Sequence, residues 1–250
     1  TESHQYSSND TGRFFMRLQI ESAVPRDFFE NQLTPVIERY DMDWHLDVVG
    51  RPMKTLVLVS KSAHCLNDML FRQRSGTLPI EVPAVFGNHP DLAEMAAFYG
   101  VPFEVHPITG EADKRAFEQM LRTYIHSAGI ELIVLARYMQ VLSDEFCQEF
   151  AGKIINIHHS FLPGFKGANP YARAHARGVK LIGATAHFVT GDLDEGPIIE
   201  QNVVRVQHSD SKNRMVSIGR DVEAKTLTQG VRWFAEHRVL LDGDRTVIFS

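Results

Sequence analysis

The run Lys153-Ile154-Ile155-Asn156-Ile157 is largely apolar and leads into His158-His159-Ser160, where a loop rich in Ser, Pro and Gly begins. Apolar runs without polar alternation are typical of strands that are covered on both faces, as in parallel sheets. In a strand, residues two apart point to the same face. We therefore expect Asn156 and His158 to project together where a buried strand ends.

The chain after about residue 51 repeats this rhythm of short apolar runs and amphipathic segments. Such alternation predicts an α/β fold with a mostly parallel, Rossmann-like sheet that helices cover on both sides. We expect a hairpin at 182–189 and 198–206. The other expected strands are 55–60, 82–86, 103–106, 132–136 and 153–157, and the expected helices are 65–74, 91–99, 111–127, 171–177 and 214–238.

The first 50 residues have a different pattern and predict a small α+β domain. They contain a strand-like run at 13–20, a helical pattern around 28–40 that Pro35 interrupts, and a second strand-like run at 44–49. The stretch Gly50-Arg51-Pro52 is a plausible linker. The sequence thus predicts two domains, residues 1–50 and residues 51–250.

Composition argues against several classes of function. The net charge is −5 over 250 residues with no long basic run, so neither nucleic acid nor an anionic membrane is an expected partner. No apolar stretch approaches the ~20 residues of a membrane span, and the first ten residues do not resemble a secretory signal. The two cysteines are far apart, which favours reduced thiols in a cytoplasmic protein.

Asn156, His158 and a carboxylate can together act on a carbonyl group. The Asn156 amide and a protonated His158 can donate hydrogen bonds to an oxygen that becomes negative as a nucleophile adds. Asp194, in the loop before Gly196-Pro197, can raise the pKa of His158 and orient a water molecule. This chemistry needs no metal, and the twelve histidines show no HExxH spacing. Each feature also has a plain structural reading, an ordinary strand end and an ordinary turn.

Three motifs in order carry a resemblance to a known family: Asn156-Ile157-His158-His159-Ser160-Phe161-Leu162-Pro163, then His187-Phe188-Val189, then Leu193-Asp194-Glu195-Gly196-Pro197-Ile198-Ile199-x-Gln201. They resemble the signature of the formyltransferase fold that uses formyltetrahydrofolate. Within that fold, the chain most resembles the formyltetrahydrofolate deformylases. These enzymes of one-carbon and purine metabolism hydrolyse 10-formyltetrahydrofolate to tetrahydrofolate and formate.

Three features separate the chain from the sibling family that formylates glycinamide ribonucleotide. The segment Ser60–Leu66 has no glycine, whereas a phosphate site of the sibling's type needs closely approaching backbone amides. His159 and Phe161 stand where the transferases typically have Pro and Leu. The first domain resembles the second half of an ACT domain, a small ferredoxin-like regulatory unit that commonly pairs between subunits.

The resemblance implies roles for individual residues. Asn156, His158 and Asp194 would be catalytic, and the partners would be 10-formyltetrahydrofolate, as substrate rather than cofactor, and water. A homo-oligomer through the ACT-like domain is also implied. The first strand, the first helix and most of the second strand of an ACT unit have no counterpart here, so amino-acid regulation does not follow. The residues expected to bind the folate are Met139, Gln140, Leu142, His187, Thr190, Gly191 and Asp192.

Two other functions remain open at the level of sequence. The first keeps the fold but passes the formyl group to an amine acceptor, and formyl loss in buffer without an amine would argue against it. The second is a folate or amino-acid sensor without catalysis. The intact set of Asn156, His158 and Asp194 weighs against a sensor, because a sensor does not need all three.

Overall fold

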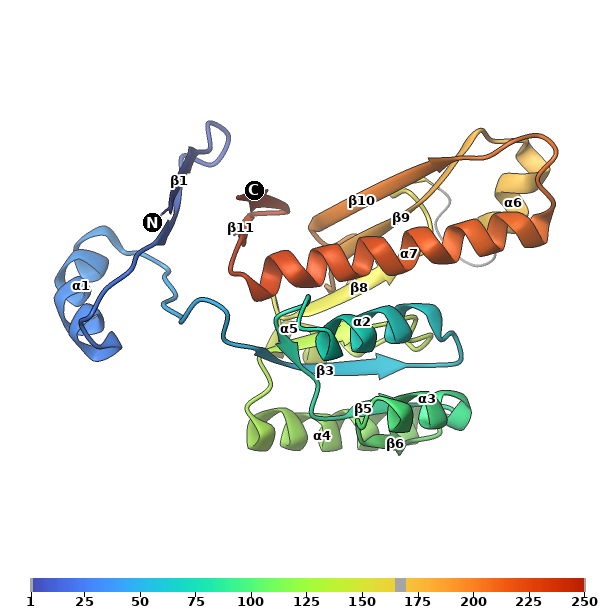
Figure 1. Cartoon of the computed structure of the whole chain (residues 1–250), viewed down its shortest axis with the longest axis horizontal. Coiled ribbons are helices and arrows are strands. Elements are labelled where there is room, and N and C mark those ends of the chain that lie inside the picture. Colours follow the sequence, from blue (N-terminus) through green and yellow to red (C-terminus); the bar gives the residue numbers. More distant parts are fainter. Residues whose placement is uncertain (1, 165–169, 250) are drawn as a thin grey trace. The chain divides into compact units, whose positions relative to one another are not determined.

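The computed structural model describes residues 2–164 and 170–249, which divide into two compact units (Figure 1). The first unit ends at Arg51 and includes Phe249, and the second runs from Pro52 to Ile248. Within the described residues, no helix is long and apolar enough to cross a membrane.

The first unit consists of a two-stranded antiparallel sheet and one helix. Strand β1 (Glu2–Ser7) pairs with β2 (Phe14–Gln19), and α1 (Arg26–Tyr40) follows with Pro35 inside it. The strand expected at 13–20 and the helix expected around 28–40 are confirmed as β2 and α1. The strand expected at 44–49 is wrong: these residues form a connection without regular secondary structure. The pattern missed β1, whose mostly polar side chains are largely exposed.

The second unit is an α/β layer structure. Its helices are α2 (His64–Arg74), the 3-10 turn η1 (Pro90–Leu92), α3 (Ala93–Phe98), α4 (Glu111–Ala128), α5 (Asp144–Glu149), α6 (Pro170–Arg177) and α7 (Lys212–Ala235). Its strands are β3 (Met53–Val59), β4 (Ile80–Glu81), β5 (Val85–Gly87), β6 (Phe103–Val105), β7 (Leu132–Leu135), β8 (Ile154–His158), β9 (Leu181–Phe188), β10 (Ile198–Arg205), β11 (Val239–Asp242) and β12 (Arg245–Ile248). The sequence pattern missed α5 and the hairpin β11–β12.

The main sheet has the strand order β10-β9-β8-β7-β3-β5-β6, with β4 beside β3. The strands from β8 to β6 are parallel, whereas β9 runs antiparallel to β8 and β10 antiparallel to β9. The mostly parallel sheet and the hairpin β9–β10 are thereby confirmed. The chain starts this sheet in the middle at β3, moves outward through β5 and β6, and returns at β7. The order therefore reverses between β3 and β7, where open sheets of this kind bind ligands.

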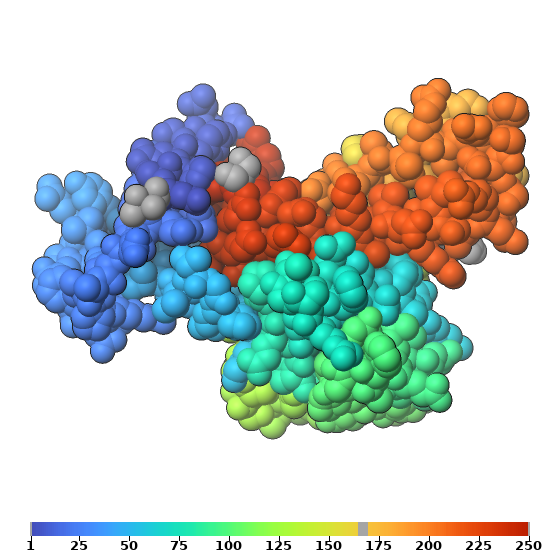
Figure 2. Space-filling model, in the orientation of Figure 1, coloured from blue at the N-terminus to red at the C-terminus, as the bar shows by residue number. Residues whose placement is uncertain are grey.

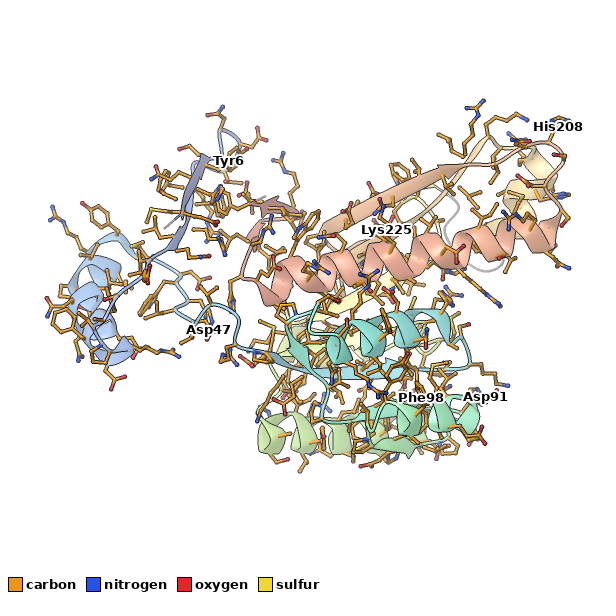
Figure 3. The ribbon with its side chains drawn as sticks, viewed as in Figure 1. Tyr6, Asp47, Asp91, Phe98, His208 and Lys225 are labelled. Atoms are coloured by element: carbon orange, nitrogen blue, oxygen red, sulfur yellow. The ribbon has the colours of Figure 1, made fainter. Side chains whose placement is uncertain are left out.

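Alternate residues of the parallel strands enter two separate cores. Val57, on one face of β3, packs in a cluster with residues of α2 and α7, and Leu58, on the other face, packs with residues of α4 and α5. Figure 2 shows α2 and α7 at the surface of this unit. On α7, Lys225 points outward (Figure 3), while Leu227 is fully buried. Both faces of β3 are therefore apolar because helices cover both.

We predict that Leu121→Ala on α4 lowers the free energy of unfolding by roughly 2–5 kcal/mol, because it leaves a cavity against the sheet. Leu121 has no exposed surface and lies in the same cluster as Leu58. Urea unfolding monitored by circular dichroism measures the change. Gln119→Ala on the exposed side of α4 is the control, with an expected change within about 0.5 kcal/mol. Equal effects of the two substitutions would contradict the packing described.

Candidate active site

Asn156 and His158 lie on one face of β8, as the strand period requires. Their neighbours Ile155 and Ile157 point the other way, into the core beneath α2 and α7. Asn156 is paired with Leu135, the last residue of β7, so His158 extends beyond the end of that strand. The predicted amide and imidazole therefore stand together at the carboxyl edge of the sheet.

Asp194 reaches these residues from the connection between β9 and β10. One of its carboxylate oxygens, Oδ1, lies 3.2 Å from Nδ1 of His158 and 3.7 Å from Nε2 of His187. The hydrogen bond from His158 lowers the pKa of Asp194 below its usual range, although partial burial opposes the shift. Asp194 is thus an ionised carboxylate at neutral pH, and its contact with His158 holds one imidazole nitrogen.

The backbone of this connection folds back on itself. Val189 donates a backbone hydrogen bond to Ile154 near the start of β8, yet Asp194 contacts His158 at its end. Asp194 has a left-handed backbone (φ 59°), a conformation that costs energy for a non-glycine residue and concentrates at functional sites. A Cβ on Gly196 would lie 1.9 Å from the carbonyl oxygen of Phe188, so glycine is required where the chain returns.

His187 orients the Asn156 amide. The two residues are directly opposite each other on β9 and β8, and Nδ2 of Asn156 lies 3.2 Å from Nε2 of His187. Nδ1 of His187 lies 2.8 Å from the carbonyl oxygen of Phe188, which can only accept, so Nδ1 carries the proton and Nε2 accepts from Asn156. Burial lowers the pKa of His187, in agreement with a neutral ring. The sequence placed His187 near the folate; its position beside Asn156 depends on strand register.

Nε2 of His158 is the second ring nitrogen of the candidate site. It is buried and has no hydrogen-bond partner among residues 2–164 and 170–249. Buried polar atoms are nearly always paired, so Nε2 is open to a bound water or ligand. Nδ1 already contacts Asp194, so Nε2 is the ring nitrogen that remains available.

The predicted folate-binding residues other than His187 lie in two neighbouring segments. Met139 donates its backbone N–H to Oγ of Ser60 at the end of β3 (2.9 Å), a contact that the sequence did not indicate. Met139 is largely exposed, whereas the Leu142 side chain is buried in the core on the side of α4. Leu142 can therefore contribute only through its backbone. Gln140, between them, is partly exposed.

The second segment contains Thr190, Gly191 and Asp192. The Thr190 hydroxyl donates to the carbonyl oxygen of Asp192 at 3.1 Å, which closes a small turn. A Cβ on Gly191 would lie 3.1 Å from the Asp144 carboxylate of α5, so this loop passes close to the helix that follows Leu142. The structure therefore brings the two segments of predicted folate-binding residues close to each other.

The turn after His158 is held by a polar cluster that explains Gln201 in the third motif. The amide nitrogen of Gln201 donates to the carbonyl oxygen of Leu162 (2.9 Å) and to Oγ1 of Thr185 (3.0 Å). Thr185, which pairs with His158, donates in turn to the carbonyl oxygen of Ser160 at 2.9 Å. These bonds fix the chain directly after His158.

His159, beside His158, is a neutral group in the folded protein. Burial, assisted by the charge of Arg137, lowers the pKa of His159 to about 4. In the unfolded chain the imidazole titrates near its ordinary value of about 6.5. Between these two values, the unfolded state binds a proton that the folded state does not, so stability falls as pH falls.

We predict that His159→Gln removes part of this acid sensitivity. Between about pH 7 and pH 5, the wild-type free energy of unfolding should fall by about 2 kcal/mol more than that of the variant. Urea unfolding at the two pH values measures the difference. His208→Gln, at an exposed position (Figure 3), is the control and should retain the wild-type slope. An unchanged slope in His159→Gln would contradict a neutral, buried His159.

Comparison with known proteins identifies the family of this chain. The family model for formyl transferases matches residues 53–231. A formyltetrahydrofolate deformylase of Corynebacterium sp. (strain P-1) is 49% identical over 99% of this chain and 87% of that protein. The crystal structure of formyltetrahydrofolate deformylase from Burkholderia mallei ATCC 23344 is 49% identical, with a TM-score of 0.95 over 100% of this chain and 89% of that one.

A transferase structure is less similar. Glycinamide ribonucleotide transformylase 1 from Symbiobacterium toebii is 31% identical, with a TM-score of 0.73 over 83% of this chain and 99% of that one. The deformylases match both units at higher identity. On these grounds, the chain belongs to the formyl transferase family and, within it, to the formyltetrahydrofolate deformylases.

Proposed function

We propose that the protein hydrolyses 10-formyltetrahydrofolate to tetrahydrofolate and formate through Asn156, His158 and Asp194. The observation that carries this proposal is the contact between Asp194 and Nδ1 of His158, with Asn156 two residues earlier on the same face of β8. An ionised carboxylate, a positioned imidazole and an amide supply what addition of water to a formyl group requires.

Asn156 and His158 polarise the formyl oxygen. Nδ2 of Asn156 carries two hydrogens, of which one is directed at Nε2 of His187. The second hydrogen can be donated to the formyl oxygen, and the N–H at Nε2 of a protonated His158 can be donated to the same atom. Both bonds strengthen as that oxygen becomes negative, which is the condition for catalysis rather than mere binding.

Asp194 orients the attacking water. The water oxygen forms a bond to the formyl carbon and its proton passes to a group or solvent molecule nearby, giving a tetrahedral intermediate. The low pKa of Asp194 makes it a weak base, so its principal role is to accept a hydrogen bond from the water and to hold His158.

Breakdown of the intermediate needs a proton on the folate nitrogen. As the bond between the formyl carbon and N10 breaks, the nitrogen takes a proton from Nε2 of His158, and the carbon leaves as formate. His158 is then neutral and is protonated again from solvent. The net change is consumption of one water and release of tetrahydrofolate, formate and one proton.

The folate ring is proposed to lie between the segments of Met139, Gln140 and Leu142 on one side and Thr190, Gly191 and Asp192 on the other. Gly191 passes close to α5, the helix that follows Leu142, so the two segments are neighbours. Because the Leu142 side chain is buried in the core, substitution at Leu142 acts on folding as well as on binding.

The first unit is proposed to be a partial ACT-like domain that joins two copies of a cytoplasmic protein. Phe14, Met16 and Leu18 are two apart on β2 and are 60%, 40% and 55% exposed. An exposed apolar face of this kind favours contact with another surface. Light scattering after gel filtration tests the proposal, and a monomer at micromolar concentration would argue against it.

We predict that Asp194→Asn and His158→Ala each lower kcat by roughly 1000-fold while the protein remains folded. His158→Ala removes the imidazole, and Asp194→Asn removes the negative charge that faces it. Stopped-flow absorbance of folate turnover and thermal unfolding give the two readouts. Asp221→Asn, on the exposed side of α7, should retain wild-type turnover. Near-normal hydrolysis in either test variant would disprove the roles proposed here.

The function itself is tested by incubating 10-formyltetrahydrofolate with the protein in buffer that lacks an amine. We expect tetrahydrofolate and formate in equal amounts, because water is the acceptor. Formyl loss only after addition of an amine would indicate a transferase. Binding without turnover in either condition would indicate a sensor.

A further inference from the structure

A buried ionic cluster lies next to the reactive residues and takes no part in the proposed mechanism. Its centre is Glu223 on α7, which is 1% exposed. Glu223 Oε1 accepts a hydrogen bond from the Tyr171 hydroxyl at 2.5 Å, and Oε2 lies 2.8 Å from Nε2 of His64. Nε of Arg137, the residue that follows the end of β7 by two positions, lies 3.4 Å from the same oxygen. Glu223 therefore joins four separate elements.

The cluster is a hydrogen-bonded unit rather than a metal site. Ligand atoms of His64, Cys65 and Glu223 lie within 4.8 Å of one another, a separation that ligands of an ion would have. Burial raises the pKa of the Cys65 thiol well above its usual value, which disfavours the thiolate that a metal needs. The guanidinium of Arg137 already lies against the Glu223 carboxylate, so a second cation there would be repelled.

Glu223 is ionised despite its burial. Burial by itself raises the pKa of Glu223, but the hydrogen bond from His64 and the charge of Arg137 more than offset it, and the pKa lies below its usual range. Loss of any partner would leave a buried charge incompletely compensated, which is strongly unfavourable. The cluster is therefore rigid as a unit.

A row of aromatic rings connects this cluster to the reactive histidine. The Tyr171 ring lies 6.4 Å from the His159 ring, and the His159 ring lies 5.0 Å from the His158 ring. The other side of His158 contacts Asp194. The orientation of His158 is thus set by Asp194 through a hydrogen bond and by His159 through ring packing.

Gly219 permits Tyr171 to lie against α7. A Cβ at Gly219 would be 2.2–2.4 Å from three atoms of the Tyr171 side chain. Gly219 precedes Glu223 by one helical turn, so the same face of α7 provides both space for the ring and an acceptor for its hydroxyl. Tyr171 is held from two directions.

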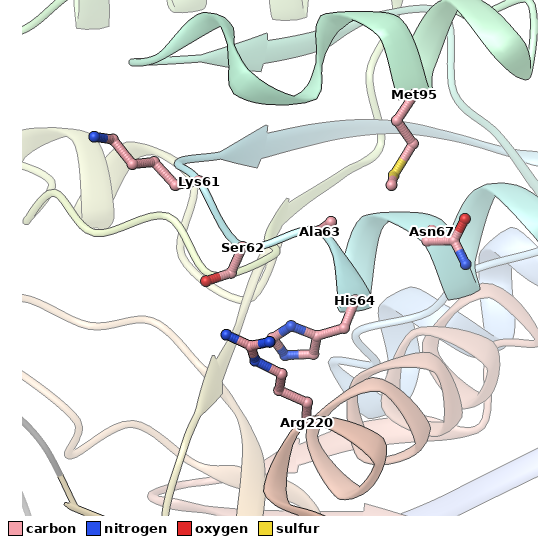
Figure 4. Close-up of a pocket in the computed structure, with 7 residues that line it drawn as sticks. All are labelled: Lys61, Ser62, Ala63, His64, Asn67, Met95 and Arg220. Atoms are coloured by element: carbon pink, nitrogen blue, oxygen red, sulfur yellow. The ribbon is translucent and has the colours of Figure 1, made fainter. Parts of the chain in front are cut away.

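His64 exposes the cluster to a pocket. This pocket of about 660 Å³ is lined by His64 together with Lys61, from the loop after β3, and Arg220, from α7 (Figure 4). His64 thus lines the pocket while its Nε2 contacts Glu223. A small molecule that enters the pocket can therefore reach the place of the His64 side chain.

We propose that Glu223 is a positioning residue for the proposed hydrolysis: by holding Tyr171 and His64, it fixes the His159 ring against which His158 rests. The inference depends on the proposed function only for its kinetic readout. Glu223 touches neither water nor formyl group in this scheme and acts through Tyr171 and His159.

We expect Glu223→Gln to lower kcat by about 10- to 100-fold with KM changed less than about twofold, since misplacement of a reactive group by about 1 Å has effects of this size. Tyr171→Phe, which removes only the hydroxyl, should lower kcat in the same direction by a smaller factor. It also serves as the second variant if Glu223→Gln does not fold. In His64→Ala, added imidazole should enter through the pocket and raise kcat again, whereas Glu223→Gln should not respond.

Asp68→Asn is the matched control. Asp68 on α2 accepts a hydrogen bond from Thr228 on α7 at 2.6 Å, so it joins the same two helices as His64 and Glu223 but has no contact with Tyr171. Its kcat should stay within about twofold of wild type. An equal loss of kcat in Asp68→Asn and Glu223→Gln would overturn the proposal, because the effect would then come from general loosening between α2 and α7.

A second readout is independent of catalysis. In protein labelled at the histidine rings, the resonances of His158 and His159 should shift in Glu223→Gln and remain in place in Asp68→Asn. Unshifted resonances in Glu223→Gln would refute the positioning role even in an active enzyme. Shifted resonances in a protein that releases no formate would refute the proposed function and leave the positioning role intact.

Discussion

The hydrogen bond between His158 and Asp194 joins the last parallel strand of the sheet to the loop between two antiparallel strands. The arrangement of the side chains proposed to be catalytic depends on this bond. The loop after β9 begins near Ile154, at the start of β8, and this bond holds the loop at the other end of the strand. The left-handed backbone at Asp194 and the close approach of Gly196 to Phe188 are the local costs of that return. Strand β8 thus carries the imidazole of His158, and the connection between β9 and β10 carries the carboxylate of Asp194.

Burial gives the histidines around this bond different tasks. His187 and His159 are both shifted toward the neutral form by desolvation, and neither adds a positive charge beside His158. His187 serves as an acceptor for Asn156, and His159 serves as a packing surface. The two carboxylates also have different partners. Asp194 contacts the His158 ring, while Glu223 contacts Tyr171, His64 and Arg137. One small region therefore holds two ionised acids with distinct surroundings.

The sequence predicted most of the parallel sheet because its strands are continuous apolar runs, and those runs exist since both faces are covered. It also placed Asn156 and His158 on one face, which needs only the strand period. The strand expected at 44–49 was wrong because a pattern of side chains does not show whether a pairing partner exists. The contacts of Asn156 with His187, and of Met139 with Ser60, were invisible because they depend on register and on pairing across 79 residues. Glu223 was missed for the same reason, since its partners come from three distant segments.

The hydrogen bonds from Phe188 through His187 to Asn156 run in one direction, which the backbone carbonyl oxygen of Phe188 determines. A backbone oxygen cannot donate, so His187 must give it the Nδ1 proton, and the lone pair at Nε2 must then face Asn156. Only the NH₂ group of the Asn156 amide can donate a hydrogen bond to this lone pair. The backbone carbonyl oxygen of Phe188 therefore determines which end of the Asn156 amide faces His187, although Asn156 is the side chain proposed to act on the substrate. Every amino acid has such a carbonyl oxygen. An aspartate at position 156 would have nearly the same shape but no hydrogen to donate. It could pair with His187 only if the ring proton moved from Nδ1 to Nε2. A substitution can remove the side chain of His187 or Asn156, but it leaves the carbonyl oxygen of Phe188 in place.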